Sequence, residues 1–197
     1  MDLPFALETD VERRLAADPR WRLGVEWGVP RRGHPEGAVK LHVAEVLANL
    51  DLLDLDEDQR TRLRIAALAH DAFKREVTWW RPRVPPNEHG FIAARWLRGF
   101  IGDERLLALV ELHDEGFRAW KAGEAGRDDE AASRIAGVVR RLGDDIDLFV
   151  AFYWADNRSG DKRPGQVEWF IDRLARLGIS AQIPARASHR TREGRIP

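Results

Sequence analysis

Residues 63–74 read LRIAALAHDAFK, an apolar run that ends in an adjacent histidine and aspartate. Leu63, Ala66 and Ala67 recur at the three- and four-residue spacing of one helix face, and the same step leads to His70. The alternation of apolar and polar residues that is typical of a half-buried strand is scarce here and in the rest of the chain. This stretch therefore predicts a helix that carries a histidine on its buried face.

The same periodicity recurs along the chain and predicts an all-α fold. We expect helices near residues 8–17, 36–53, 57–74, 87–101, 103–121, 128–142, 144–158 and 164–178. A chain of 197 residues fits one domain and can bury a sizeable core. We expect a single helical bundle over residues 31–178. The segment 1–30 is expected to pack on it as an N-terminal helix and connection, and 179–197 to form a mobile basic tail.

The composition excludes several classes of partner and site. Lys and Arg number 32 against 33 Asp and Glu, which leaves no basic footprint for bulk nucleic-acid binding. No apolar stretch reaches the ~20 residues of a membrane span, and the N-terminal sequence does not resemble a signal peptide, so we expect a cytoplasmic protein. Cysteine is absent, so imidazoles and carboxylates would have to hold any metal ion.

Other predicted helices also carry a polar side chain on their apolar face. His42 lies three residues after Val39 and four before Val46, within such a stripe. The corresponding side chains of three further helices are His89, His113 and Asp156. A buried polar group without a partner costs about 1–3 kcal/mol or more, and sharing one cation would remove most of that cost. The alternative is a set of unrelated buried polar groups.

The ligand types narrow the choice of ion without settling it. Asp71 follows His70 and lies about 100° further round the helix, so both side chains can reach one ion near a helix end. Imidazole and carboxylate ligands suit Mn²⁺, Fe, Co²⁺, Ni²⁺ or Zn²⁺, and Mg²⁺ where carboxylate and water dominate.

These residues resemble the HD superfamily of metal-dependent phosphohydrolases, whose pattern is a histidine, an adjacent His-Asp pair and a distant aspartate. Here the pattern reads LHVAEVL around His42, AALAHDAFK around His70 and Asp71, and FYWADNRSGDK around Asp156. The resemblance runs from about residue 31 to 177. The runs GHPEGAVKLHVAEVL, EHG and ELHD are most similar to the HD domain of bacterial tRNA nucleotidyltransferases. The nucleotidyltransferase head has no counterpart here, so the chain resembles a free-standing HD domain.

The resemblance implies a ligand set and a reaction. It makes His42, His70, Asp71 and Asp156 the ligands of a first divalent ion. His89 and His113 match positions that hold a second ion in two-metal members, so the number of ions, one or two, stays open. The implied activity is hydrolysis of a phosphoester of a nucleotide or related small molecule by metal-activated water. Asp71 would orient that water or take its proton, and Lys74, in the spacing His-Asp-x-x-Lys, would approach the phosphate.

Other charged and aromatic residues near the motifs have two interpretations. Arg158 and Lys162 follow Asp156 and either bind the substrate phosphate or merely solubilise the surface. Lys74 either approaches the phosphate or is a solvated lysine at a helix end. The segment 76–87, EVTWWRPRVPPN, either covers the site or buries its tryptophans against the domain. The alternative to an enzyme is a non-catalytic HD-like module that binds a nucleotide or protein partner and keeps a structural metal. The oligomeric state stays open.

Overall fold

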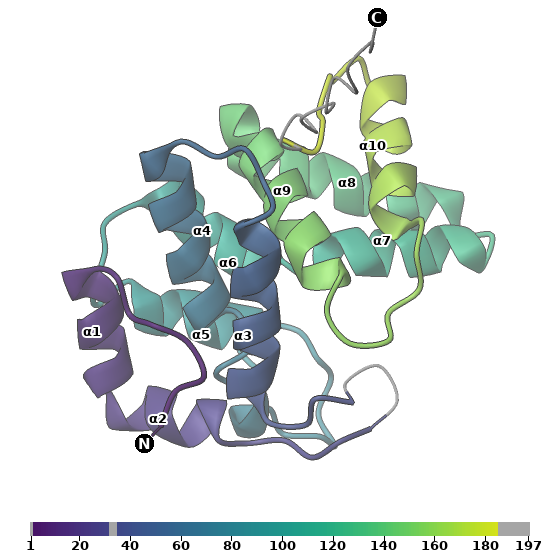
Figure 1. Ribbon diagram of the computed structural model, residues 1–197. Coiled ribbons are helices and arrows are strands. Elements are labelled where there is room, and N and C mark those ends of the chain that lie inside the picture. The colour runs from purple at the N-terminus through teal and green to yellow at the C-terminus, as the bar shows by residue number, and fades with distance from the viewer. Residues whose placement is uncertain (1, 32–34, 185–197) are drawn as a thin grey trace, which may run out of the picture.

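The computed structural model describes residues 2–31 and 35–184, and in these ranges the chain forms a helical bundle without a β-strand (Figure 1). The all-α prediction is therefore confirmed. No helix in the described ranges combines the length and the apolarity that crossing a membrane requires. Of the predicted tail, residues 185–197 lie outside the described residues, whereas Ile179 and Ile183 pack against the core.

Ten α-helices and two 3-10 turns follow one another in these ranges. They are α1 (Asp10–Ala17), α2 (Pro19–Val25), α3 (Val39–Leu50), α4 (Glu57–Ala69), η1 (Lys74–Glu76), α5 (His89–Leu97), α6 (Glu104–Leu112), α7 (Glu115–Glu124), α8 (Asp128–Leu142), η2 (Gly143–Asp145), α9 (Ile146–Asn157) and α10 (Gln166–Arg176).

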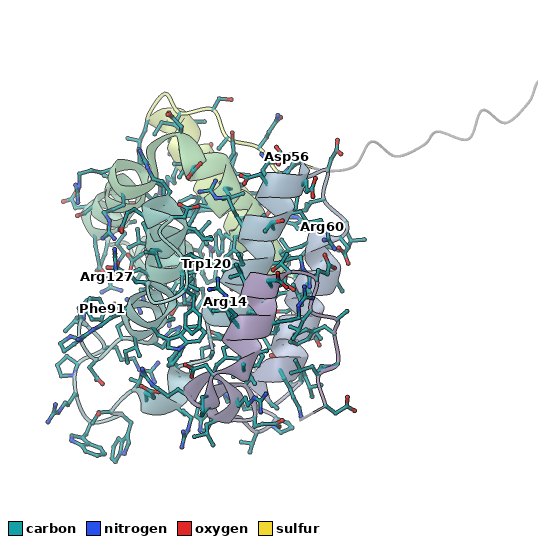
Figure 2. All side chains as sticks on the ribbon, turned by 90° about the vertical axis from the view of Figure 1, so that its left-hand side faces the viewer. Arg14, Asp56, Arg60, Phe91, Trp120 and Arg127 are labelled. Atoms are coloured by element: carbon teal, nitrogen blue, oxygen red, sulfur yellow. The ribbon has the colours of Figure 1, made fainter. Side chains whose placement is uncertain are left out.

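Local sequence signals explain where several helices begin. Asp56 precedes α4 and forms a capping box, in which its side chain accepts from the Gln59 backbone N–H while the Gln59 side chain accepts from the Asp56 N–H. One turn into the same helix, Arg60, which is labelled in Figure 2, pairs with Glu8 and Asp51 and so ties α4 to neighbouring segments. These contacts fix the start of the helix whose far end carries His70.

The core helices are those that the sequence marks as apolar. α3, α4 and α9 contact one another, while α5 pairs with α6 and α7 with α8. α9 is buried on nearly all sides, as its sequence IDLFVAFYWADN implies. α1 and α2 lie at one end of the bundle and α10 at the other (Figure 1). The ends of α4, α6 and α9 therefore meet in the interior, next to α3 and α5.

Several predicted helices end earlier than the periodicity indicates, and two of these early ends carry a His-Asp pair. The predicted helix 57–74 stops at Ala69, and the predicted helix 103–121 divides at His113 and Asp114 into α6 and α7. The two halves have different main partners, because α6 packs mainly on α5 and α7 mainly on α8, although α8 also contacts α6. Both early ends place a His-Asp pair just beyond a helix, where its side chains are free to turn toward a common centre.

Candidate metal centre

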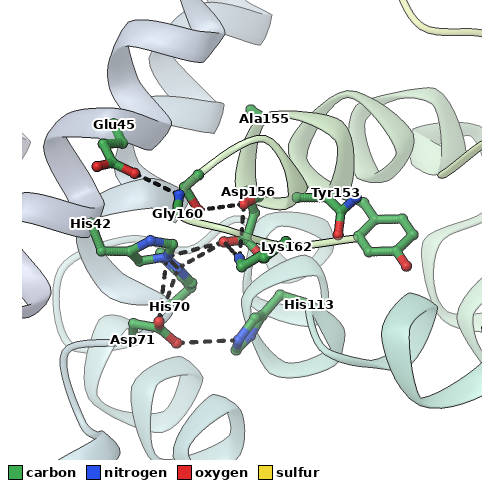
Figure 3. Close-up of polar contacts among 12 residues, drawn as sticks. His42, Glu45, His70, Asp71, His113, Tyr153, Ala155, Asp156, Gly160 and Lys162 are labelled. Carbon is green, nitrogen blue, oxygen red and sulfur yellow. Dashed lines mark hydrogen bonds and ion pairs between the residues drawn. The ribbon is translucent and has the colours of Figure 1, made fainter. Parts of the chain in front are cut away.

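The four residues predicted for a first ion lie together in the interior. Nε2 of His42, on α3, is 3.1 Å from Nε2 of His70, which follows α4. Asp71 Oδ2 lies 3.5 Å from each of these nitrogens. Asp156 Oδ1, from α9, lies 3.0 Å from His42 Nε2 and 3.8 Å from His70 Nε2 (Figure 3). Two imidazole nitrogens and two carboxylate oxygens therefore surround one point.

A second group of the same kind adjoins the first. Nε2 of His89, at the start of α5, is 3.1 Å from Nε2 of His113, which follows α6. Asp71 Oδ1 lies 3.3 Å from the His89 nitrogen and 3.6 Å from the His113 nitrogen. Asp71 thus directs one oxygen at each histidine pair. Within each of the two groups, the candidate ligand atoms of the two histidines and Asp71 lie within 4.8 Å of one another.

Backbone contacts determine which ring nitrogen of two histidines faces the cluster. Nδ1 of His70 donates to the carbonyl of Ala67 at 2.9 Å, and Nδ1 of His113 donates to the carbonyl of Val110 at 2.8 Å. In the neutral rings, Nε2 therefore carries the lone pair that a metal ion requires. His42 turns Nε2 inward in the same way and has Glu36 Oε1 at 3.4 Å from its Nδ1.

The electrostatics of the cluster favour neutral His70 and ionised carboxylates. Burial lowers the pKa of His70 to about 3. Burial alone would raise the pKa of Asp71 and Asp156, but Lys74 and Lys162 respectively, with neighbouring histidines, hold both values well below the usual range. For Asp114, His113 and His89 outweigh burial and lower the pKa to about 2. Three ionised carboxylates therefore surround the imidazoles at neutral pH.

Two lysines, Lys74 and Lys162, reach the cluster. The Lys74 ammonium pairs with Asp71 Oδ2, and Lys162 Nζ lies 2.8 Å from both Asp156 Oδ1 and the Asp156 carbonyl oxygen (Figure 3). The loop that carries Lys162 is held to α3, because the Gly160 N–H donates to Glu45 at 2.8 Å. In contrast, Arg158 stacks over Trp154 at 4.6 Å and lies outside the cavity described next.

A cavity of about 740 Å³ opens beside the cluster. Asp71, His113 and Asp156 reach it from the metal centre, together with both lysines. Its remaining lining consists of Asp114, Phe117, Trp120, Lys121, Glu124, Ala125, Tyr153, Asn157, Asp161, Arg163 and Gln166. The volume lies within the range of small-molecule sites, roughly 300–1,000 Å³. A ligand in this cavity would contact both metal-binding groups and the ammonium groups beside them.

The loop of residues 76–87 takes neither of its two predicted roles. Trp79 and Trp80 are 80% and 69% exposed, and neither lines the cavity. The loop is closed by Asn87, whose side chain accepts from the Thr78 N–H at 2.8 Å and donates to the Thr78 carbonyl at 3.0 Å. Because these polar contacts hold the loop together, its tryptophans need not be buried.

Sequence reasoning missed one acidic residue at the centre. Asp114 Oδ2 lies 3.6 Å from His89 Nε2, and Oδ1 lies 3.7 Å from His113 Nε2. The signal was present in the sequence, since ELHD at 111–114 repeats the His-Asp pair of residues 70–71. Asp114 therefore joins the second group beside Asp71.

Comparison of the chain with protein-family models, with curated proteins and with solved structures found no significant match. The resemblance to the HD superfamily therefore stays a prediction that rests on the sequence motifs.

Proposed function

We propose that this chain is an HD-type metal-dependent phosphohydrolase with a two-ion centre. The first ion would be held by His42, His70, Asp71 and Asp156, and the second by Asp71, His89, His113 and Asp114. The single observation that carries the proposal is the position of Asp71, whose two oxygens face two separate histidine pairs at 3.3–3.6 Å beside an open cavity. A bridging carboxylate between two ions has this relation to its neighbours.

The residues present fit divalent transition metals. In the second group, Nε2 of His89 and Nε2 of His113 lie 3.1 Å apart, which requires a proton or a metal cation between the two nitrogens. The two groups together supply four imidazoles and three carboxylates, a set that suits Mn²⁺, Fe, Co²⁺, Ni²⁺ or Zn²⁺ better than Mg²⁺.

The residues around the centre can serve phosphoester hydrolysis. Bound divalent ions supply water of lowered pKa and offset charge on the phosphoryl oxygens. Lys74 and Lys162 line the same cavity, so their ammonium groups can donate to phosphoryl oxygens when the substrate enters. For Lys74, burial lowers the pKa, but Asp71 and Asp114 outweigh it and raise the value, so this lysine carries its charge at neutral pH. Asp71, engaged on both sides, is better suited to bridging than to accepting a proton.

A non-catalytic module with a structural metal is the less favoured alternative. A structural site is closed on all sides by protein ligands, whereas a catalytic site keeps an open position. Here Asp71, His113 and Asp156 all border the cavity. Substrate-sized space next to the ligands supports the enzyme.

A second candidate function is O₂-dependent oxidation at iron. Each histidine pair with Asp71 forms a set of two imidazoles and one carboxylate, which is the ligand set of many non-haem Fe(II) oxygenases. The two lysines in the cavity favour a phosphate-bearing substrate in either case. Only the reaction differs.

The test is a metal-by-substrate screen. Protein stripped with a chelator is reloaded with Mn²⁺, Fe²⁺, Co²⁺, Ni²⁺, Zn²⁺ or Mg²⁺ and incubated with nucleoside monophosphates, cyclic and linear phosphodiesters and sugar phosphates. Released phosphate, new monoesters and consumed O₂ are measured. We expect metal-dependent cleavage of a phosphoester. Asp71→Ala should abolish this cleavage, and Asp161→Asn, a change in the same cavity, should retain it. O₂ consumption without phosphoester cleavage favours the oxidation. If neither reaction is detected, the non-catalytic module is favoured.

A further inference from the structure

One face of α7 leads from the metal centre to the far end of the cavity. Asp114, Phe117, Trp120 and Glu124 follow one another at three- and four-residue spacing, and all four line the cavity. Trp120 lies six residues beyond Asp114, a distance of about 9 Å along a helix at 1.5 Å per residue. A ligand whose phosphate lies at the cluster would therefore place its opposite end near Trp120.

The far end of the cavity has an aromatic wall. The rings of Phe117 and Trp120 are nearly parallel, with 26° between their planes and 6.0 Å between their centroids. Phe117 is 39% exposed although its neighbours Gly116 and Ala119 are buried. Trp120, labelled in Figure 2, is partly buried and also borders the cavity. Two aromatic rings that face a cavity rather than the core are suited to stacking against a flat ligand.

A displaceable cation lies over this wall. The Arg163 guanidinium is 6.0 Å from the Trp120 ring centroid, and it pairs with Glu124 at 3.7 Å. The side chains of this pair are 68% and 55% exposed, so their interaction is weak and can give way to a ligand. A flat ring stacked between the Trp120 ring and the Arg163 guanidinium needs about 7 Å between those two groups, since each stacking contact takes roughly 3.5 Å. Arg163 would have to move outward by only about 1 Å.

A buried carboxamide completes the wall. Gln166, the first residue of α10, is 3% exposed and yet lines the cavity. Its oxygen accepts from the Tyr153 hydroxyl at 3.3 Å, and its amide nitrogen has no hydrogen bond to any residue that the structure describes. A ligand in the cavity that accepts from this nitrogen would gain a hydrogen bond. Ring nitrogens and exocyclic carbonyls of a nucleobase are such acceptors.

We propose that this end of the cavity is a nucleobase subsite, in which the base stacks on Trp120 and accepts a hydrogen bond from Gln166. The subsite deepens the proposed function and rests on it for the position of the phosphate. Under this proposal the substrate is a nucleotide, and a sugar phosphate without a base would bind less tightly.

Binding of uncleavable analogues tests the subsite. The ligands are phosphonates of adenosine and uridine 5′-monophosphate and of ribose 5-phosphate, in which CH₂ replaces the ester oxygen, and calorimetry of the purified chain gives each Kd. We expect the nucleotide analogues to bind more tightly than the ribose analogue.

Trp120→Ala should raise the nucleotide Kd by about tenfold, the effect of losing one stacked base, and leave the ribose Kd unchanged. Trp120→Phe should keep most of the affinity, and Gln166→Met should lose part of it. The exposed Trp79→Ala is the matched control and should change neither Kd.

The remaining outcomes overturn the subsite. These are equal affinity for nucleotide and ribose analogues, an equal loss for both in Trp120→Ala, or no binding of either nucleotide analogue. Circular dichroism of each variant excludes a folding defect as the cause. Because binding of phosphonates requires no turnover, failure here leaves the phosphohydrolase itself to be decided by the metal-by-substrate screen.

Discussion

His70 and His113 end their helices in the same way. In each, Nδ1 donates to the carbonyl three residues earlier, at 2.9 and 2.8 Å, and Nε2 faces another histidine at 3.1 Å. An aspartate follows each of them. The chain therefore presents one arrangement twice, and Asp114 stands to His113 as Asp71 stands to His70.

This equivalence predicts the effect of Asp114→Asn. The change removes the charge that faces His89 and His113 while it keeps the shape of the side chain, and Asp114 makes no side-chain cap on α7 that would be lost. We expect the second ion to bind at least about 10–100-fold more weakly, because that is the usual loss even for a carboxylate that only orients a ligand. Elemental analysis after dialysis against a series of free Mn²⁺ concentrations measures this. The control is Asp161→Asn, another acid that lines the cavity. Two ions bound at wild-type affinity in Asp114→Asn would place Asp114 outside the metal centre.

Asp71 and Asp156 are predicted to differ in how many ions their loss removes. Asp71 directs an oxygen at both histidine pairs, whereas Asp156 faces only His42 and His70. We expect Asp71→Ala to retain neither ion and Asp156→Ala to retain one, the ion held by His89 and His113. Metal content per chain is the readout. Retention of one ion by Asp71→Ala contradicts the bridging role.

Close packing at Gly90 predicts an effect on one histidine pair only. A Cβ at this position would lie 2.5 Å from the Glu111 carbonyl oxygen and 3.1 Å from that of Val110, so α5 would have to move away from α6. Gly90→Ala should therefore destabilise the fold by about 1–3 kcal/mol and separate His89 from His113. Chemical denaturation and metal content measure the two effects.

A matched control for this prediction is Gly137→Ala. Gly137 lies within α8, and no atom would lie within 4 Å of its added Cβ. Alanine there should be neutral or stabilise the helix by up to about 1 kcal/mol. If Gly90→Ala is as well tolerated as Gly137→Ala, the packing of α5 on α6 is looser than the distances indicate.

The helices were largely predictable because their periodicity is strong. The prediction for 128–142 coincides with α8. The break between α6 and α7 was not predictable, because helical spacing continues straight through it at Leu106, Leu109, His113 and Phe117. The main packing partner changes from α5 for α6 to α8 for α7, and periodicity does not contain that information. The short helix α2 was missed for a similar reason, since burial of Trp21 rather than a long pattern stabilises it.

The histidines of the centre were predictable in position, and their distances confirm that they lie together. Each lies on an apolar face, where a polar side chain is conspicuous. Metal binding itself remains a prediction. The nucleobase subsite was not predictable, because Trp120 and Gln166 come from α7 and α10, whose contact depends on the whole fold. Arg158 shows that closeness in sequence does not place a side chain at the site. It follows Asp156 by two residues, yet its guanidinium lies over the Trp154 ring.

A buried ion pair far from the centre carries a stability prediction. Arg64 Nε donates to Glu12 Oε1 at 2.8 Å, and the two side chains are 5% and 0% exposed. Glu12→Gln removes the buried counter-charge and leaves Arg64 with the more exposed Glu8 carboxylate at 3.0 Å, so we expect a loss of about 1.5–3 kcal/mol in the free energy of unfolding. Asp10→Asn, which breaks the exposed pair with Arg13 on the same helix, should have no measurable effect. Equal effects of the two changes in urea denaturation contradict this role of burial.

The two lysines beside the carboxylates are predicted to act on the substrate rather than on the metal. Lys74 and Lys162 neutralise Asp71 and Asp156 in the structure, and both line the cavity that a phosphate would enter. Replacing either by Met removes a cation from the phosphate without removing a ligand from the metal. We therefore expect kcat/KM for the cleaved phosphoester to fall about 10–100-fold, which corresponds to roughly 1.4–2.7 kcal/mol, while two ions remain bound. Lys121→Met is the matched control, because Lys121 lines the cavity but lies over the Phe117 ring at 5.6 Å. It should change kcat/KM less than either of the others. Loss of metal in Lys74→Met or Lys162→Met, with kcat/KM restored by excess ion, would instead make these lysines supports of the metal centre.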